Sequence, residues 1–158
     1  RLIIATADKI PISAITTRSS ISVNPSVRRV MSILSMREAT DVHKVSNYYV
    51  TEPVGYEDQP DFVNAVCIIE TELPAIDLLN MLHGIEKAMG RERTIKWGPR
   101  TLDLDIIQYG SMLSSAEELT LPHPRAHERK FVLEPWHEIE PDAILLTHGK
   151  IADLLSKL

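Results

Sequence analysis

The sequence RERTIKWGPRTLDLDII, residues 91–107, is the stretch around which the fold and the chemistry of this chain are organised. Its first half gathers cations in a chain whose net charge is -5. A basic loop in an acidic chain is suited to holding one polyphosphate, although such clusters are more often plain solvated loops. The cations of this loop are Arg91, Arg93, Lys96 and Arg100.

The second half of the stretch alternates apolar and acidic residues. Side chains of a strand alternate with period two, so Asp103 and Asp105 are expected to share one face. Mg²⁺ prefers carboxylate oxygens and typically takes one or two of them, completing its shell with water and substrate phosphates. An Asp-x-Asp pair is more often a solvated face, but beside a basic loop it predicts a Mg-nucleotide site. The opposite face is expected to carry Leu102, Leu104 and Ile106.

Length and composition bound the class of protein. At 158 residues, with 44% hydrophobic and 25% charged residues, we expect a single globular domain over residues 1–158. The net charge of -5 argues against a general nucleic-acid binder. No apolar stretch approaches the roughly 18 residues of a membrane span, and no signal peptide is visible. Cys67, the single cysteine, lies in an apolar run, which predicts a buried thiol and fits a cytoplasmic protein.

The N-terminal part is expected to form a strand and a helix. Of two apolar runs, residues 2–5 and 10–15, the second is expected to be the first strand, and the hydroxyl-rich residues 16–22 a loop. Asn24 is expected to cap a helix that starts with Pro25. Its apolar stripe is expected to be Val27, Val30, Met31 and Leu34.

Two further strands and a long helix follow. Residues 44–51 and 61–70 are rich in β-branched and aromatic residues, which predicts strands. Their turn-rich connector, 52–60, is longer than a tight hairpin needs, and binding loops tend to lie in such segments. Pro74 is expected to start the helix and Gly90 to end it. The core stripe of this helix is expected to be Leu78, Leu82, Ile85 and Met89.

The order strand, helix, strand, strand, helix, strand predicts an α+β fold, the ferredoxin-like βαββαβ sandwich, with a C-terminal extension. The extension is expected to contain a proline-stiffened loop at 121–125 and a short apolar segment at 130–133. A small closing helix is expected to carry Ile151, Leu154, Leu155 and Leu158.

Four motifs follow one another along the chain: YYVTEP at 48–53, DQPDFVNA at 58–65, WGPRTLDLDII at 97–107 and LPHP at 121–124. In this order they closely resemble the 6-hydroxymethyl-7,8-dihydropterin pyrophosphokinase family of the folate pathway. The resemblance runs from about Val27 to the C-terminus with almost no gaps. It implies an enzyme that transfers the terminal pyrophosphoryl group of ATP to the hydroxymethyl group of the pterin and releases AMP, in tetrahydrofolate biosynthesis.

The resemblance also implies roles for residues of the opening stretch. Asp103 and Asp105 match the aspartates that hold two Mg²⁺ ions, and Asp105 or a water beside it is a candidate acceptor of the hydroxyl proton. Arg91 and Arg100 match basic residues of a mobile catalytic loop, and Trp97 its closing aromatic. A guanidinium can hold phosphate oxygens bidentately, and loop closure excludes water.

Two further sets match the substrate contacts of the family. The residues that match ATP contacts are His83, Glu86, Ile106, Thr120, His123 and Arg129. The residues that match the pterin pocket are Thr51, Pro53, Val54, Phe62, Asn64 and Phe131. Aromatic rings can stack on a flat heterocycle while an amide supplies both donor and acceptor to its edge, although core packing alone would also explain the two phenylalanines. His127 and His137 are interpreted as surface residues.

The N-terminal edge departs from the family pattern. The family's first strand normally ends in a Gly-Ser-Asn turn, and the gapless register places Thr17-Arg18-Ser19 there. A β-branched threonine does not readily take the conformations open to glycine. Alternatively, residues 2–9 form the first strand and a longer loop follows. If residues 2–9 are not the first strand, residues 1–9 are expected to be a linker or the tail of an upstream folate enzyme. Residue 1 is Arg rather than Met, so the chain is expected to be processed, trimmed or cut from a longer one.

We therefore expect a monomeric pyrophosphokinase that acts on small molecules, with no nucleic-acid or membrane partner, fused to or associated with another folate enzyme if an upstream domain exists. The first alternative is a noncatalytic or weakly active homologue that binds nucleotide and pterin but lacks the Gly-Ser-Asn turn. The second is a ferredoxin-like interaction or RNA module, which predicts an exposed basic-aromatic sheet, whereas the basic cluster of this chain lies in one loop.

Overall fold

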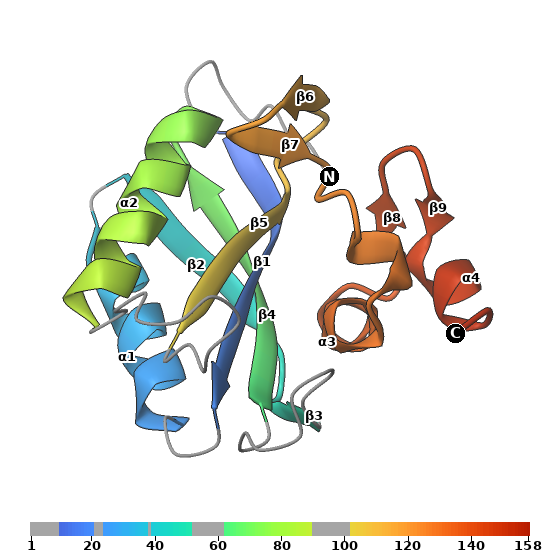
Figure 1. Cartoon of the computed structure of the whole chain (residues 1–158), viewed down its shortest axis with the longest axis horizontal. Coiled ribbons are helices and arrows are strands. Elements are labelled where there is room, and N and C mark those ends of the chain that lie inside the picture. The colour runs from blue at the N-terminus through green and yellow to red at the C-terminus, as the bar shows by residue number, and fades with distance from the viewer. Residues whose placement is uncertain (1–9, 21–23, 38, 52–61, 90–101) are drawn as a thin grey trace.

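A computed structural model describes residues 10–20, 24–37, 39–51, 62–89 and 102–158, and it has a mixed α/β fold with antiparallel sheets (Figure 1). The main sheet has the order β2-β4-β1-β5, and β3 also pairs with β4. All of these pairings are antiparallel. The strands are β1 (Ile10–Ser20), β2 (Thr40–Val45), β3 (Tyr49–Thr51), β4 (Phe62–Thr71) and β5 (Asp103–Gln108).

Helices lie on both sides of this sheet (Figure 1). Two of them, α1 and α2, cover one face, while α3 covers the other and packs against α4. None of the helices in the described ranges is both long and apolar enough to cross a bilayer. The helices are α1 (Asn24–Ser35), α2 (Ala75–Ala88), α3 (Lys130–Ile139), α4 (Ile151–Leu155) and the short 3-10 helix η2 (Ala126–Glu128).

Two small hairpins complete the C-terminal part. The strands β6 (Ser114–Ala116) and β7 (Leu119–Leu121) form one, and β8 (Ile144–Leu145) and β9 (Gly149–Lys150) form the other. Neither was predicted, because strands of two or three residues are too short to show a period-two pattern.

The sheet separates two hydrophobic cores. Cys67 and Leu104 belong to the core under α1 and α2, whereas Val66 and Ile107 belong to the core under α3. This division follows from the alternation of side chains along a strand. The predicted stripes of α1 and α2 are confirmed at five buried positions, Met89 is half-buried just past the end of α2, and the Cys67 thiol is buried as expected. The buried stripe residues are Val30, Leu34, Leu78, Leu82 and Ile85.

The first strand is longer than predicted. Residues 16–20, expected as part of a loop, belong to β1. Their backbone pairs with β4 on one side, and Thr16 to Arg18 also pair with β5 on the other, so the sheet supplies hydrogen bonds that the local sequence could not reveal. Thr17-Arg18-Ser19, which stand where the family has its tight turn, are extended strand here. The alternative strand at residues 2–9 lies outside the described part of the chain.

The predicted strand at 44–51 is divided into β2 and β3, which is a correction. β2 ends at Val45, because the hydroxyl of the next residue, Ser46, accepts the backbone N–H of Val66 at 3.0 Å while the Ser46 backbone N–H donates to the Val66 carbonyl at 2.9 Å. A side-chain oxygen thus takes the place of a ladder carbonyl, and Ser46–Tyr48 leave the strand.

The C-terminal extension also differs from expectation. Residues 130–133, expected as a short apolar segment, begin the ten-residue helix α3. The closing helix ends at Leu155, so Leu158 lies outside it and is 55% exposed. Only five residues are helical there, too few to carry a stripe as long as the one predicted.

Candidate active site

A cleft of about 340 Å³ lies between α2, β5 and the β6–β7 hairpin. Both predicted metal ligands, Asp103 and Asp105, line it. Five of the six residues that match ATP contacts also line it. These five are His83, Glu86, Ile106, Thr120 and His123.

The strand β5 presents the two aspartates as predicted. Asp103 and Asp105 are half-buried, and Leu104 and Ile106 are buried on the opposite face. The side chain of Glu86 is 2% exposed, and its Oε1 accepts the backbone N–H of Leu104 at 2.7 Å. This buried carboxylate therefore ties α2 to β5 at the residue between the two aspartates. The sequence predicted Glu86 as an ATP contact, and the structure gives its carboxylate a role within the protein.

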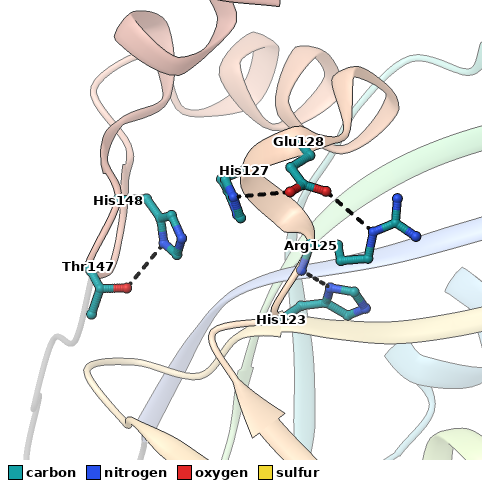
Figure 2. A network of polar contacts seen from close by, with 6 residues as sticks. All are labelled: His123, Arg125, His127, Glu128, Thr147 and His148. Carbon is teal, nitrogen blue, oxygen red and sulfur yellow. Dashed lines mark hydrogen bonds and ion pairs between the residues drawn. The ribbon is translucent and has the colours of Figure 1, made fainter.

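His123 enters the cleft with one ring nitrogen already engaged. Its Nδ1 accepts the backbone N–H of Arg125 at 3.2 Å (Figure 2), and its backbone N–H donates to the Ile107 carbonyl at 2.8 Å. Burial, with help from the nearby Arg129 charge, lowers the pKa of His123 from 6.5 to about 4. The ring is therefore neutral at neutral pH and carries its proton on Nε2, where it can donate one hydrogen bond.

Arg129 connects the two predicted substrate sides. Its guanidinium carbon lies 5.6 Å from the centroid of the Phe131 ring, within range of a cation–π contact. Burial lowers the pKa of Arg129, while the charges of Asp105 and Asp103 act in the opposite direction. Arg129 is thus close enough to the aspartate pair to interact with it electrostatically, and it stands over an aromatic ring that matches the pterin pocket.

The carboxylate pair suits one class of metal. Among the residues that the structure describes, no group of three or more His, Cys, Asp or Glu could hold a metal ion. Asp103 and Asp105 instead provide hard oxygen donors on one face of β5. This donor set fits Mg²⁺, which keeps water and substrate phosphates in its shell and does not require a cage made only of protein groups.

Asn64 is the polar centre of the predicted pterin side. Its side chain is 2% exposed, and its Nδ2 donates to Thr51 Oγ1 at 2.8 Å and to the Tyr49 carbonyl at 3.3 Å. A carbonyl can only accept, so the amide nitrogen must face Tyr49. The buried Oδ1 has no hydrogen-bond partner within the described ranges. The sequence predicted that this amide would offer a donor and an acceptor to the pterin. In the structure, the amide N–H group donates to Tyr49 and Thr51, so only the oxygen remains for a ligand.

Cross-strand register brings the two sides together. Asn64 on β4 pairs with Arg18 on β1, which pairs with Asp103 on β5, and Tyr49 on β3 pairs with Asn64. Directly opposed residues point to the same face, and strands are 4.7–4.9 Å apart, so the Asn64 and Asp103 positions are about 10 Å apart on one face of the sheet.

The remaining predicted residues divide into two groups. Thr51, Phe62 and Phe131 are half-buried, and Phe131 lies on α3. Arg91, Trp97, Arg100, Pro53 and Val54 lie outside the described residues.

His127 and His137, which were predicted to be surface residues, are only partly exposed. His127 stacks on His148 with ring centroids 4.2 Å apart, its Nδ1 is buried, and its Nε2 lies 3.6 Å from Glu128 (Figure 2). Like His127, His137 is half-buried. Glu117 and Glu118 also line the cleft. The sequence did not predict them as site residues, because a Glu-Glu pair in a turn is typical of a solvated loop.

The sequence matches a family model described as 7,8-dihydro-6-hydroxymethylpterin-pyrophosphokinase (HPPK) over residues 19–141. A 2-amino-4-hydroxy-6-hydroxymethyldihydropteridine pyrophosphokinase of Haemophilus influenzae is 42% identical over 127 residues, 80% of this chain and 79% of the relative. A protein of the same name from Bacillus subtilis is 45% identical over 113 residues, 72% of this chain and 68% of the relative. The folic acid synthesis protein fol1 of Schizosaccharomyces pombe is 43% identical over 133 residues, 84% of this chain but 18% of the relative.

Proposed function

The chain belongs to the 7,8-dihydro-6-hydroxymethylpterin-pyrophosphokinase family, and from this premise we propose that the cleft beside Asp103 and Asp105 is where its pyrophosphoryl transfer takes place. The chain is an ATP-dependent pyrophosphokinase of folate biosynthesis. Its reaction transfers pyrophosphate from ATP to 6-hydroxymethyl-7,8-dihydropterin and releases AMP. The family uses ATP as co-substrate and typically Mg²⁺.

The cross-strand row from Asn64 through Arg18 to Asp103 carries this placement. A pterin whose ring edge lies at Asn64 has its hydroxymethyl arm within reach of a polyphosphate at the aspartates, since the two positions are about 10 Å apart. The pterin and the transferring phosphates then meet on the sheet face that α3 covers, and proximity of this kind lowers the barrier to transfer.

Pyrophosphoryl transfer does not require a covalent intermediate with the protein. The hydroxymethyl oxygen forms a bond to the β-phosphorus of ATP, and the bond from that phosphorus to the α,β-bridging oxygen breaks. AMP leaves with the electron pair, and the hydroxyl proton passes to Asp105 or to a water beside it. Asp103 and Asp105 would hold two Mg²⁺ ions, which when bound supply charge neutralisation for the phosphates. His123 donates its Nε2–H to a phosphate oxygen, and Arg129 adds positive charge nearby.

The basic loop completes this side of the proposed site. By the family resemblance, Arg91 and Arg100 bind phosphate oxygens and Trp97 helps to close the loop, so that water is excluded during transfer. By the same resemblance, Ile106 and Thr120 contact the adenosine, and His83 and Glu86 are further nucleotide contacts. All four residues line the cleft.

The pterin is proposed to bind with its edge at Asn64. The buried Oδ1 accepts a hydrogen bond from a ring N–H of the pterin. This bond removes the free-energy penalty of burying an acceptor that has no hydrogen bond. Phe62 and Phe131 provide flat apolar surfaces for the heterocycle. Thr51, Pro53 and Val54 complete the proposed pocket.

We also propose a ferredoxin-like βαββαβ arrangement, a single pyrophosphokinase domain over residues 1–158, and a monomer. Support for the arrangement is the strand order β2-β4-β1-β5 with α1 following β1 and α2 following β4. Support for one domain is the second core, in which α3 packs on the main sheet and α4 packs on α3. Relatives such as fol1 are much longer than this chain, so the domain is compatible with fusion to other enzymes.

The test is AMP release from ATP, Mg²⁺ and 6-hydroxymethyl-7,8-dihydropterin. Asp103→Asn and Asp105→Asn should each lower kcat by about a thousandfold or more while circular dichroism stays that of the wild type. Asp153→Asn, at an exposed residue of α4, is the matched control and should keep full activity. Turnover near the wild-type rate in either site variant would place the reaction elsewhere.

A further inference from the structure

A hydrogen-bond network outside the cleft ties α3 to the segment that carries β3. At its centre is Glu138, whose Oε1 accepts the Asn47 amide Nδ2–H at 2.7 Å and the Asn47 backbone N–H at 3.1 Å. Its Oε2 accepts the Tyr49 hydroxyl at 2.9 Å and approaches the Asn47 backbone nitrogen at 3.2 Å. Hydrogen bonds to a charged acceptor are stronger than neutral ones, so one carboxylate fixes Asn47, two residues before β3, and Tyr49, the first residue of β3.

The short strand β3 is in turn what fixes the Asn64 amide. The Tyr49 carbonyl and the Thr51 hydroxyl are the two acceptors for Asn64 Nδ2, and both belong to this three-residue strand. A strand this short gains little from its own ladder bonds, and therefore depends on anchors outside the sheet. Lys44, which donates to the Ile139 carbonyl at 3.0 Å, adds a second link between β2 and the end of α3.

We propose that Glu138 is a positioning residue for the pterin: by holding Asn47 and Tyr49 it fixes β3, and β3 orients the Asn64 amide so that its Oδ1 faces the ligand. This inference rests on the proposed pterin site. Glu138 does not touch the substrate in this account, because its whole effect passes through β3.

One observation separates this role from general support of the fold. Glu138 is exposed, so replacing it leaves no buried cavity in either hydrophobic core. The loss should therefore appear in pterin recognition and not in global stability.

The test compares pterin and ATP recognition in Glu138→Ala and Glu138→Gln. The KM for the pterin should rise about tenfold in Glu138→Ala and less in Glu138→Gln, which keeps one acceptor oxygen, while the KM for ATP stays within about twofold. The control is Glu134→Gln, one turn earlier on α3, whose exposed pairing with Lys130 at 3.4 Å should matter little. Its two KM values should match the wild type.

Two further variants make the result decisive. Tyr49→Phe removes one bond to Glu138, and its effect on the pterin KM should be smaller when Glu138 is already Ala, because contacting residues are coupled. Equal rises in both KM values, or an unchanged pterin KM in Glu138→Ala, would overturn the positioning role. Asn64→Ala identifies where a failure lies: if it leaves the pterin KM unchanged, the proposed pterin site is wrong, and if it alone raises that KM, only the Glu138 inference is wrong.

Discussion

Replacing Glu86 tests how α2 holds β5, the strand that carries the proposed metal ligands, in place. The Glu86 side chain is 2% exposed and accepts the Leu104 N–H at 2.7 Å, at the residue between Asp103 and Asp105. Glu86→Ala removes this acceptor from a buried donor, whereas Glu86→Gln keeps a carbonyl oxygen of the same reach. The two variants thus separate loss of the bond from loss of its charge.

The magnitudes follow from the hydrogen bond. A buried N–H without a partner costs about 1–3 kcal/mol, and the lost side chain adds packing, so Glu86→Ala should lower the free energy of unfolding by about 3 kcal/mol. Exchanging a charged acceptor for a neutral one in Glu86→Gln should cost about 1 kcal/mol. For a chain of this length these losses correspond to decreases in Tm of about 9 °C and about 3 °C.

Thermal unfolding followed by circular dichroism measures the first effect, and the Mg²⁺ concentration that gives half-maximal AMP release measures the second. Residues that orient metal ligands typically change metal affinity by about 10–100-fold, so Glu86→Ala should raise the half-saturating Mg²⁺ concentration about tenfold. Lys87→Ala, at the neighbouring exposed position on α2, is the control and should leave both quantities unchanged. A Glu86→Ala protein with wild-type Tm and wild-type Mg²⁺ dependence would refute the reasoning, as would a Glu86→Gln variant that is less stable than Glu86→Ala.

Three further outcomes are expected. NMR titration should give His123 a pKa of about 4 with the proton on Nε2. Because this pKa is below the unfolded value of 6.5, the contribution of His123 to stability is present above pH 6.5 and is lost as the pH falls through 4. A titration midpoint near 6.5 would disprove the burial of His123. Urea unfolding should show that Leu82→Ala lowers the free energy of unfolding by about 2–5 kcal/mol. Leu158→Ala, at a residue that is 55% exposed, should change it by less than about 0.5 kcal/mol, and similar losses in the two variants would contradict the assigned core. Burial raises the pKa of the Cys67 thiol to about 12, so Ellman's reagent should modify it only after unfolding, and rapid labelling of the folded protein would show that the thiol is accessible.

The parts of the fold that depend on local pattern were predictable. The alternation at Asp103 and Asp105 placed both carboxylates on one face of a strand, and the spacing of Leu78, Leu82 and Ile85 placed α2 on the core. Both patterns repeat with the period of the backbone itself, so they can be recognised without knowing any partner. The motifs that carry the family resemblance are equally local, being short runs of neighbouring residues.

The errors arose where distant segments meet. Residues 16–20 were expected as a loop because they are rich in hydroxyls, yet pairing with β4 and β5 makes them strand. Ser46 ended a predicted strand because its hydroxyl binds the backbone of Val66, twenty residues away. Each outcome depends on a hydrogen-bond partner that no local window contains.

By itself, the sequence determined which residues are candidates for the chemistry: paired carboxylates, a basic loop, a histidine between prolines and an amide in an apolar run. Only the tertiary structure decided how these groups are engaged. It used the Glu86 carboxylate and the Asn64 amide nitrogen within the protein, left the Asn64 oxygen without a partner among the described residues, and brought the Glu138 carboxylate onto Asn47 and Tyr49. A side chain's chemical type is fixed by its covalent structure, but the partner of each donor and acceptor is fixed by packing between segments far apart in the chain.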